Sequence, residues 1–476
     1  MKTRITRTKI IATVGPASAS YKMLKKLTDA GVNTFRLNFS HGTHEAHKKV
    51  IDSIKKIRTE LKRHIGILAD LQGPKIRIGE VAKAPVYLID GKEILLTTIK
   101  SNSDAKNIFV NYSKFASDVN AGDAVLIDDG QLELKVISTN NIDTVKCKVL
   151  HGGALNSRKG VNLPHSETSL PSLTKKDLKD LKFILNEGVN WIALSFVRNA
   201  KDIIHLKKLI AKSGKNIKVI AKIEKPQAVL NIDDIIRESD GIMIARGDLG
   251  VEMPQQDIPI TQKLVIAKCI KEAKPVIIAT QIMQSMVENP RPTRAEINDV
   301  ANGIFDGADA LMLSAETATG KFPVLVIDTI KDIALNIEKQ ESIFNKKQVA
   351  DMHSKTYLSD AICYNACKIS GDVNAAAIIS MTRSGYTAFM ISSYRPKARI
   401  LIFMEDKNLL DTLSMVWGVE TFAYKKFAST DETIDDVKKI VKDFGRVQKG
   451  AIVINTAAMP VHWKGTTNML KISVID

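Results

Sequence analysis

The feature that most constrains the fold is a repeated alternation of short apolar runs with amphipathic, charged segments. The apolar runs form a group of three and a later group of five, and they lie at 10–14, 33–39, 65–71, 191–196, 218–223, 241–245, 275–280 and 310–313. Runs of this length match buried parallel strands, and the segments between them have the periodicity of crossover helices. Because eight strand–helix units close a barrel, we predict an α/β fold built on a (β/α)8 TIM barrel.

The alternation is interrupted between the third and fourth runs. The residues from Gly73 to about Thr168 favour short strands, and turn signals such as Asp90-Gly91 separate them. The expected strands lie at 85–89, 93–98, 124–127, 132–137 and 145–151. We therefore predict an all-β domain at 73–168, inserted into a barrel domain that consists of 1–72 and 169–344.

A polar stretch near residue 345 marks a second change of pattern. Beyond it, helices are expected at 358–368, 386–393, 409–415 and 433–442. Strands are expected at 375–380, at 398–403, at 451–455 and at the C-terminus. This alternation predicts a separate, open α/β domain at 345–476.

Composition limits the classes of partner. The net charge of +17 could attract nucleic acid or small phosphorylated anions, but only 5% of the residues are aromatic and no basic block is interleaved with aromatics. No nucleic-acid partner is therefore expected. Four cysteines in 476 residues indicate a reducing compartment, and the sequence shows no signal-peptide pattern and no apolar stretch of membrane-spanning length. These features predict a cytoplasmic protein without a membrane partner.

Charged residues follow the fifth and sixth predicted barrel strands. Lys222 and Glu224 are two residues apart, so an extended chain points both side chains to the same side. Asp248 follows Gly247, where the next apolar run breaks and a loop is expected. Two carboxylates supply the hard oxygen ligands that Mg²⁺ prefers, and a lysine beside them suits chemistry on a phosphate or an enolate. Ordinary salt bridges at strand ends are the alternative interpretation of each residue taken alone.

Polar residues also end most of the other predicted strands. Arg36 can bind phosphate oxygens in a bidentate manner, the backbone N–H groups of Gly247 and Asp248 could hold a carboxylate, and Thr280 offers a hydroxyl for orientation or proton relay. The remaining residues of this kind are Asn38, Ser40, Asp70, Ser195, Ser314 and Glu316. Because a barrel interior built only for stability prefers branched apolar residues, this polar rim predicts an enzyme.

Other motifs are less specific. Neither a P-loop nor a G-x-G-x-x-G fingerprint occurs. His41, His44 and His47 are spaced by three, which favours a solvated helix face over a metal site, although His41 could face a ligand. In the last domain, 382–387 joins a strand to a helix, and its hydroxyls and glycine suit either a phosphate or an ordinary turn.

Several of these stretches resemble the pyruvate kinase family. The similar blocks occur in the family's order, and they are FRLNFSHG, LADLQGPKIRIG, KGVNLPHSETSLPSLTKKD, KVIAKIEKPQAV, MIARGDLGVE, ATQIMQSM and LMLSAETATGKFP. The resemblance implies a (β/α)8 domain with an inserted β-domain lid and a C-terminal regulatory domain. It also implies a homotetramer that transfers phosphate from phosphoenolpyruvate to ADP, giving pyruvate and ATP.

The resemblance implies roles for individual residues. The catalytic set would be Lys222, Arg36, Thr280 and Ser314; Lys222 would stabilise the transferring phosphoryl group, and Thr280 and Ser314 would lie near a proton relay to the enolate. Mg²⁺, for which Mn²⁺ could substitute, would bind Glu224 and Asp248. Phosphoenolpyruvate would contact Arg36, Lys222, Gly247, Asp248 and Thr280. The nucleotide, ADP or ATP, would contact Asn38, Phe39, Ser40, His41, Arg77 and Lys159.

One departure from the family pattern concerns potassium. The positions that match the family's K⁺ site are Asn38, Ser40, Asp70 and the carbonyl of Leu71. The K⁺-dependent members carry threonine where Leu71 stands and glutamate where Lys75 stands. The ammonium of Lys75 can supply the positive charge that K⁺ otherwise brings, so we predict activity without K⁺. A solvent-exposed hinge lysine is the alternative interpretation.

The resemblance also implies an effector pocket for a phosphorylated small molecule in the last domain. Its residues would be Thr382, Arg383, Ser384, Gly385, Thr387, Trp463 and Lys464. Two other functions stay open from the residues alone. A Mg²⁺-dependent lyase that works through a pyruvate enolate could use Glu224 and Asp248, and a binder driven by the +17 charge could hold RNA with a steep salt dependence.

Overall fold

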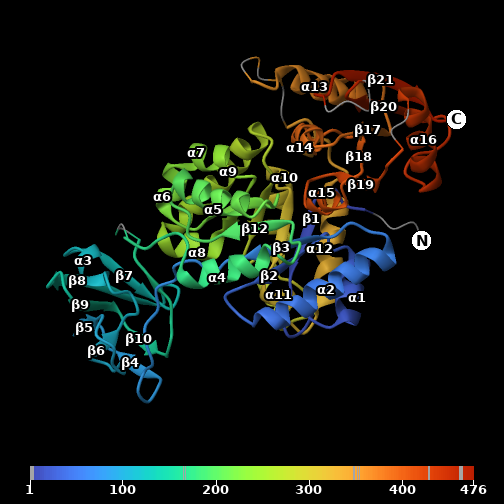
Figure 1. Cartoon of the computed structure of the whole chain (residues 1–476). Coiled ribbons are helices and arrows are strands. Elements are labelled where there is room, and N and C mark those ends of the chain that lie inside the picture. The colour runs from blue at the N-terminus through green and yellow to red at the C-terminus, as the bar shows by residue number, and fades with distance from the viewer. Residues whose placement is uncertain are drawn as a thin grey trace.

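The computed structural model describes residues 5–476, except 165, 167, 347, 348, 351, 353, 427, 428 and 460–464. The chain forms a central barrel, a β-rich domain at one end and an α/β domain at the other (Figure 1). Four hydrogen-bonded sheets make up these parts: the closed barrel, a two-stranded and a six-stranded sheet, and a five-stranded sheet.

The barrel confirms the predicted fold class. Its eight strands all run parallel and close in the order β1-β16-β15-β14-β13-β12-β3-β2. The strands are β1 (Lys9–Thr13), β2 (Thr34–Asn38), β3 (Gly66–Asp70), β12 (Trp191–Leu194), β13 (Lys218–Ile223), β14 (Gly241–Ala245), β15 (Val276–Ala279) and β16 (Ala310–Leu313). Each of the eight predicted runs overlaps one of them.

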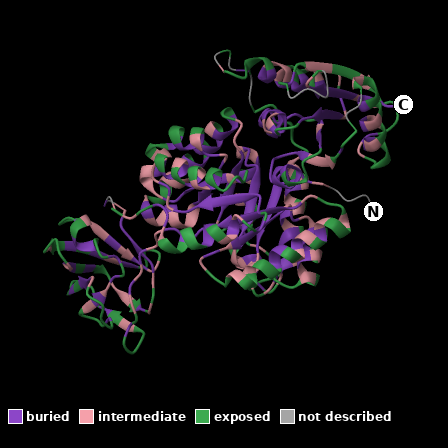
Figure 2. Ribbon diagram, in the orientation of Figure 1, coloured by how far each residue is buried: buried purple, intermediate pink, exposed green. Residues whose placement is uncertain are grey.

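Helices surround the strands on the outside of the barrel. They are α1 (Tyr21–Ala30), α2 (His44–Leu61), α4 (Lys175–Ile184), α5 (Ala200–Lys212), α6 (Pro226–Leu230), α7 (Ile232–Glu238), α8 (Arg246–Glu252), α9 (Ile258–Lys271), α10 (Arg294–Asp306), α11 (Ala315–Ala318) and α12 (Pro323–Ile337). Thr174 with Asp177 and Thr293 with Glu296 form capping boxes that begin α4 and α10. Figure 2 shows the strands buried and the outer faces of the helices exposed.

The inserted segment leaves the barrel after β3 and returns before α4. Its strands are β4 (Val86–Leu88), β5 (Glu93–Thr97), β6 (Asn107–Phe109), β7 (Ala124–Ile127), β8 (Leu132–Thr139), β9 (Thr144–His151), β10 (Gly153–Leu155) and β11 (Val161–Asn162), with one short helix, α3 (Phe115–Asp118). They form a sheet of order β11-β7-β8-β9-β5-β6 and a separate antiparallel pair, β10-β4. Since β3 ends at the carboxyl mouth of the barrel, the insert is attached there.

The C-terminal part is an open sheet with helices. Its elements are α13 (Tyr357–Asp372), β17 (Ala377–Met381), α14 (Tyr386–Ser393), β18 (Arg399–Met404), α15 (Lys407–Leu413), β19 (Val419–Ala423), α16 (Thr430–Asp443), β20 (Ile452–Ala457) and β21 (Met469–Val474). The strand order is β19-β18-β17-β20-β21, and β21 runs antiparallel to β20. Separate apolar clusters cover the two faces of the sheet.

The C-terminal domain packs on the amino-terminal ends of the barrel strands. Met415 lies in the same apolar cluster as the barrel interior residues Ile11, Leu68 and Trp191. The indole Nε1 of Trp191 donates a hydrogen bond to the carbonyl of Thr412 at 3.1 Å. The two added domains therefore lie at opposite ends of the barrel, and only the insert is near the strand ends that carry the predicted chemistry.

Candidate active site

A buried charge cluster lies at the carboxyl ends of β3, β12 and β13. The Nζ of Lys222 is 2.8 Å from Glu224 Oε1, 3.3 Å from Asp70 Oδ1 and 2.8 Å from the hydroxyl of Ser195. Lys222 is 9% exposed, and Asp70 and Glu224 are 1% exposed. The predicted placement of Lys222 and Glu224 on one side of their strand is confirmed.

Arg36, in the middle of β2, extends this cluster. Its Nε and one terminal nitrogen both contact Asp70 Oδ2, at 2.8 Å and 2.7 Å, and the other terminal nitrogen donates to the hydroxyl of Thr13 at 3.0 Å. Asp70 thus lies between two cations and fixes the spacing of Arg36 and Lys222. Two fixed positive groups at one edge of a barrel mouth can bind a phosphorylated substrate.

The electrostatics of the cluster favour the charged forms of its central pair. Burial alone would raise the pKa of Asp70, but the charges of Lys222 and Arg36 outweigh burial and hold that pKa below its usual value. Burial alone would lower the pKa of Lys222, but Asp70 and Glu224 raise it above the usual value for lysine. Lys222 is therefore a permanent cation at neutral pH, suited to stabilising charge rather than to moving protons.

The position of Asp248 differs from the expected loop. The chain enters helix α8 directly after β14, so Gly247 and Asp248 lie in the first turn of that helix. Gly247 does not break the chain here, because a helix interior tolerates glycine at a small cost. Arg246 anchors the helix start by pairing both terminal nitrogens with Asp299, each at 2.7 Å. Asp248 Oδ1 is 3.4 Å from the Nζ of Lys75.

Thr280 follows β15 in a strained backbone conformation. Its φ is +68°, which is a genuine outlier for a β-branched residue. The hydroxyl accepts a hydrogen bond from the N–H of Gly247 at 2.7 Å and donates to the carbonyl of Ala279 at 2.6 Å. The strained backbone thus holds this hydroxyl against the start of α8. Such strain concentrates at functional sites.

Glu224 and Asp248 fit a divalent metal. Burial raises the pKa of Glu224; Lys222 opposes this shift and the nearby charge of Asp248 adds to it. A divalent cation shared by the two carboxylates would remove their mutual repulsion. In the described part of the chain no three His, Cys, Asp or Glu side chains gather in a metal-binding group. The metal would therefore take its other ligands from substrate oxygens and water, as Mg²⁺ commonly does.

The predicted nucleotide residues lie in two places. Asn38 ends β2, and its side-chain oxygen accepts from the N–H of Ser40 at 3.1 Å. Phe39 and His41 follow it, and the ring of Phe39 stacks on His47 at 4.3 Å between centroids. Arg77 and Lys159 belong to the insert, where Arg77 donates to the carbonyl of Arg158 at 3.0 Å and Lys159 pairs with Asp128 at 2.9 Å.

The residues of the predicted K⁺ site are joined to protein donors. Asp70 pairs with Arg36 and Lys222, as described above. The carbonyl of Leu71 accepts from the hydroxyl of Ser195 at 2.7 Å. His44 and His47, for which the sequence favoured a solvated helix face, are half-buried on α2 and bind Asp180 at 2.8 Å and the carbonyl of His41 at 2.9 Å.

Ser314 lies just beyond β16, at the start of α11. Its N–H donates to Glu316 Oε2 at 2.7 Å, and the N–H of Met283 donates to the other oxygen of the same carboxylate at 3.2 Å. Glu316 is 1% exposed. Through these two hydrogen bonds, the Glu316 carboxylate connects the two loops that carry Thr280 and Ser314.

Most of the predicted effector residues line one cavity in the C-terminal domain. Thr382, Arg383, Ser384 and Thr387 contribute to a hollow of about 500 Å³ at the start of α14. Gly385 has a φ of +78° at this turn, which favours glycine. Trp463 and Lys464 lie outside the described residues.

Three contributors to the site were not assigned a role from the sequence. Thr13 positions Arg36, Ser195 connects Lys222 to the Leu71 carbonyl, and the N–H of Phe196 donates to Glu224 Oε2 at 2.6 Å. Ser195 was recognised only as a polar strand end. A backbone N–H leaves no signature in side-chain pattern, and Thr13 is one of many threonines near strand ends.

A (β/α)8 barrel whose mouth holds cations, carboxylates and a strained hydroxyl defines an enzyme that acts on anionic substrates. Residues 5–327 match the family described as pyruvate kinase, barrel domain, and residues 360–473 match pyruvate kinase, alpha/beta domain. The chain belongs to the pyruvate kinase family and is an enzyme of that family. Pyruvate kinases use phosphoenolpyruvate and ADP and generally require Mg²⁺.

Individual relatives agree with this assignment. The pyruvate kinase of Staphylococcus epidermidis is 41% identical over 472 residues, covering 98% of this chain and 80% of the relative. Pyruvate kinase 2 of Synechocystis is 43% identical over 475 residues, covering 98% and 79%. The crystal structure of a pyruvate kinase from Cryptosporidium parvum superposes with a TM-score of 0.92 at 34% identity, covering 99% and 96%. Among the described residues, no helix is long and apolar enough to cross a membrane.

Proposed function

We propose that the barrel mouth transfers the phosphoryl group of phosphoenolpyruvate to ADP through Lys222, Arg36, Glu224, Asp248 and Thr280. The observation that carries this proposal is the position of Lys222, held between Asp70, Glu224 and Ser195. Held on three sides, its ammonium faces the developing charge of a phosphoryl group with little reorganisation. Arg36, held by Asp70, binds the phosphate from a neighbouring strand.

The carboxylate of phosphoenolpyruvate would lie at the start of α8. The N–H groups of Gly247 and Asp248 are in the first turn of that helix, where an anion is favoured. Glu224 and Asp248 would hold Mg²⁺, or Mn²⁺ in its place, which supplies Lewis-acid stabilisation of charge on phosphate and enolate oxygens. Lys75 pairs with Asp248 at 3.4 Å, so its ammonium must move when Asp248 takes up the metal.

The enolate left by transfer must gain a proton to become pyruvate. Thr280 is the best-placed hydroxyl, because the N–H of Gly247 and the carbonyl of Ala279 fix its oxygen. Ser314 lies on the adjacent loop, which Glu316 braces. These two hydroxyls would relay the proton to the enolate carbon.

The nucleotide would bind between the barrel rim and the insert. Asn38, Phe39, Ser40 and His41 would approach it from the barrel, and Arg77 and Lys159 from the insert. Closure of the insert would exclude water and protect the phosphoryl group from hydrolysis. On this proposal residues 1–72 and 169–344 form the catalytic domain, 73–168 the lid and 345–476 the effector domain.

The enzyme is proposed to need no K⁺. Three contacts support this: the Lys75 ammonium lies beside Asp248, the Leu71 carbonyl accepts from Ser195, and Asp70 pairs with Arg36. The chain is further proposed to act as a cytoplasmic homotetramer, with a phosphorylated effector in the cavity near Arg383. Exposed Ile260 and Leu264 on α9 and Ile297 on α10 support association of subunits.

The K⁺ proposal is tested by pyruvate formation with K⁺ or with tetramethylammonium at the same ionic strength. The wild-type rate should change by less than about twofold, because Lys75 supplies the charge. The double variant Leu71→Thr with Lys75→Glu restores the family's K⁺-dependent pattern, and its activity should fall in tetramethylammonium and recover in K⁺. A wild-type rate that rises tenfold or more with K⁺ would remove the role given to Lys75 and leave the phosphoryl transfer intact.

A further inference from the structure

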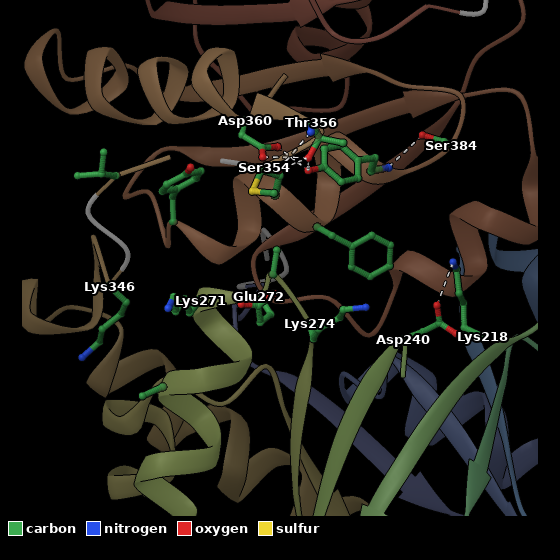
Figure 3. Close-up of a pocket in the computed structure, with 17 residues that line it drawn as sticks. Lys218, Asp240, Lys271, Glu272, Lys274, Lys346, Ser354, Thr356, Asp360 and Ser384 are labelled. Atoms are coloured by element: carbon green, nitrogen blue, oxygen red, sulfur yellow. Dashed lines mark hydrogen bonds and ion pairs between the residues drawn. The ribbon is translucent and has the colours of Figure 1, made fainter. Parts of the chain in front are cut away.

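A cavity lies between the amino-terminal ends of the barrel strands and the C-terminal domain, at the opposite end of the barrel from the catalytic residues. Its volume is about 790 Å³. One wall consists of residues at the amino-terminal ends of β13 and β14, at the end of α9 and just after it; the other includes residues of α13 and α14 together with Ser354, Thr356 and Ser384. Figure 3 shows Lys218, Asp240, Lys271 and Lys274 on the first wall and Ser354, Thr356, Asp360 and Ser384 on the second.

The barrel wall carries more positive than negative charge. Asp240 pairs with Lys207 at 3.1 Å and with Lys218 at 3.4 Å. The charges of both lysines act on Lys274. The Nζ of Lys274 donates to the backbone carbonyl of Ser239 at 2.6 Å. Lys207 lies outside the lining; the lining itself holds Lys218, Lys271, Lys274 and Lys346 against Asp240, Glu272 and Asp360, a net charge of +1. At the mouth, Lys271 and the adjacent Glu272 offset each other.

Burial and the neighbouring charges both act on the pKa of Lys274. Burial lowers the pKa of this lysine, and Lys207 and Lys218 lower it further, against the opposing charge of Asp240. An anion between Lys218 and Lys274 would relieve this repulsion. A phosphate monoester carries about two negative charges at neutral pH, so one such group can interact with both Lys218 and Lys274.

The opposite wall is apolar and aromatic, with its polar groups mutually satisfied. Phe389, Met390 and Tyr394 line it. Asp360 is 4% exposed and accepts hydrogen bonds from Tyr386 and from Thr356, the latter at 3.0 Å. The wall thus offers ring and thioether surface that suits a flat organic group, beside the hydroxyl-bound carboxylate of Asp360.

We propose that this cavity is a second small-molecule site, which binds an organic phosphate that carries a flat ring. The phosphate would lie between Lys218 and Lys274, and the ring would pack on Phe389. The site is distinct from the cavity near Arg383, but Thr356, Ser384 and Tyr386 line both. A ligand here would contact the barrel and the C-terminal domain at once.

This shared wall makes the two cavities interdependent. A ligand that fixes Tyr386 and Ser384 in one cavity changes the surface presented to the other. Any change that one ligand makes in the affinity of the other must be reciprocal, because the two binding free energies are linked. The proposal concerns binding alone, so it stands or falls independently of the reaction proposed at the barrel mouth.

The test is calorimetric titration of the full chain with phenyl phosphate, and with inorganic phosphate and phenol as its two fragments. Excess phosphoenolpyruvate and Mg²⁺, without ADP, occupy the barrel mouth. The variants are Lys218→Gln, Lys274→Gln and Phe389→Leu, each checked for folding by its thermal unfolding midpoint. Matched controls are Lys268→Gln, whose ammonium pairs with Asp233 on the outer surface, and Arg383→Ala in the neighbouring cavity.

Phenyl phosphate should bind more tightly than either fragment. Its Kd should rise about tenfold in Lys218→Gln and in Lys274→Gln, the effect of one lost charge-assisted contact. Phe389→Leu should remove most of its advantage over inorganic phosphate, and both controls should leave Kd within about twofold. The proposal is overturned if the chain shows no saturable binding under these conditions, or if Arg383→Ala weakens binding and the three cavity variants do not.

Discussion

At the scale of single residues, the most informative feature is the strain at Thr280. A β-branched side chain at positive φ costs on the order of 1–3 kcal/mol, and here it serves to hold one hydroxyl between Gly247 and Ala279. The strain is consistent with a need for the hydroxyl itself rather than for the side-chain volume. Serine keeps that group, and alanine removes it.

Thr280→Ala and Thr280→Ser form a matched pair for this idea. We expect Thr280→Ala to lower kcat about a hundredfold or more, because a positioned proton-transfer group contributes on the order of 10²–10⁴-fold. Thr280→Ser should stay within a few-fold of the wild type and should be at least as stable, because it loses the branched methyl group. Steady-state kinetics and thermal unfolding of both variants decide the point; equal losses in the two would mean that the hydroxyl has no role.

The sequence predicts residue neighbours only within one element. Lys222 and Glu224 face the same side because a strand has a period of two, and the structure confirms it. The pairing of Asp70 with Arg36 and Lys222 depends on which strands are adjacent, and no local pattern contains that information. The sequence predicts a loop at Asp248 because Gly247 interrupts the apolar run. In the structure Asp248 lies in α8, and this helix of only seven residues is too short for a clear helical pattern.

At the scale of elements, the long and strongly periodic segments were predictable and the short ones were not. All eight barrel strands were expected, since each is a buried apolar run between helices. Strands β6, β10 and β11 were missed because each has only two or three residues and, unlike the equally short β4, does not lie within a longer apolar run. Strand β19 was missed because it is a partly exposed edge strand, held by pairing with β18 rather than by a hydrophobic pattern.

The first residue of β1 gives an element-scale prediction about pH. Burial lowers the pKa of Lys9 to about 8 from 10.5, and its Nζ donates to the carbonyl of Val419 at 2.8 Å. The unfolded chain therefore binds this proton more tightly than the native state does. The resulting penalty is full below pH 8, falls between pH 8 and 10.5, and is absent above that range.

We expect the stability advantage of Lys9→Met over the wild type to shrink by up to about 3 kcal/mol as the pH rises through this range. The comparison cancels the other titrating groups, which both proteins share. Urea unfolding at a series of pH values between 8 and 10.5 measures the difference. A difference that does not change with pH would show that Lys9 keeps its ordinary pKa in the folded protein.

At the scale of the whole molecule, the barrel separates two functions. The insert is attached at the carboxyl ends of the strands, beside the catalytic cluster, and the C-terminal domain covers the amino-terminal ends (Figure 1). An effector in the C-terminal domain can therefore reach the catalytic cluster only through the barrel strands or through contacts between subunits. One of the contacts across this boundary is a buried ion pair between Asp309 and Arg395, 2.9 Å apart.

Asp309→Asn tests how strongly the two domains are joined. Asp309 is 3% exposed and Arg395 is 2% exposed, so the change leaves an uncompensated cation in the interior. We expect a loss of about 3 kcal/mol in the free energy of unfolding, measured by urea denaturation. The control is Asp233→Asn, which breaks the exposed pair with Lys268 and should cost less than about 1 kcal/mol. Similar losses in both variants would contradict a special role for the buried pair.

The central claim, that Lys222 stabilises a phosphoryl group passing from phosphoenolpyruvate to ADP, is tested most directly by ATP formation in the Lys222→Met variant. Methionine keeps most of the length of the buried side chain and removes the ammonium with its charge and its N–H donors. The account predicts that kcat falls by at least a factor of about a thousand, while Lys182→Met, an exposed lysine on α4, retains wild-type activity. A folded Lys222→Met protein that makes ATP at more than about a tenth of the wild-type rate would contradict the account.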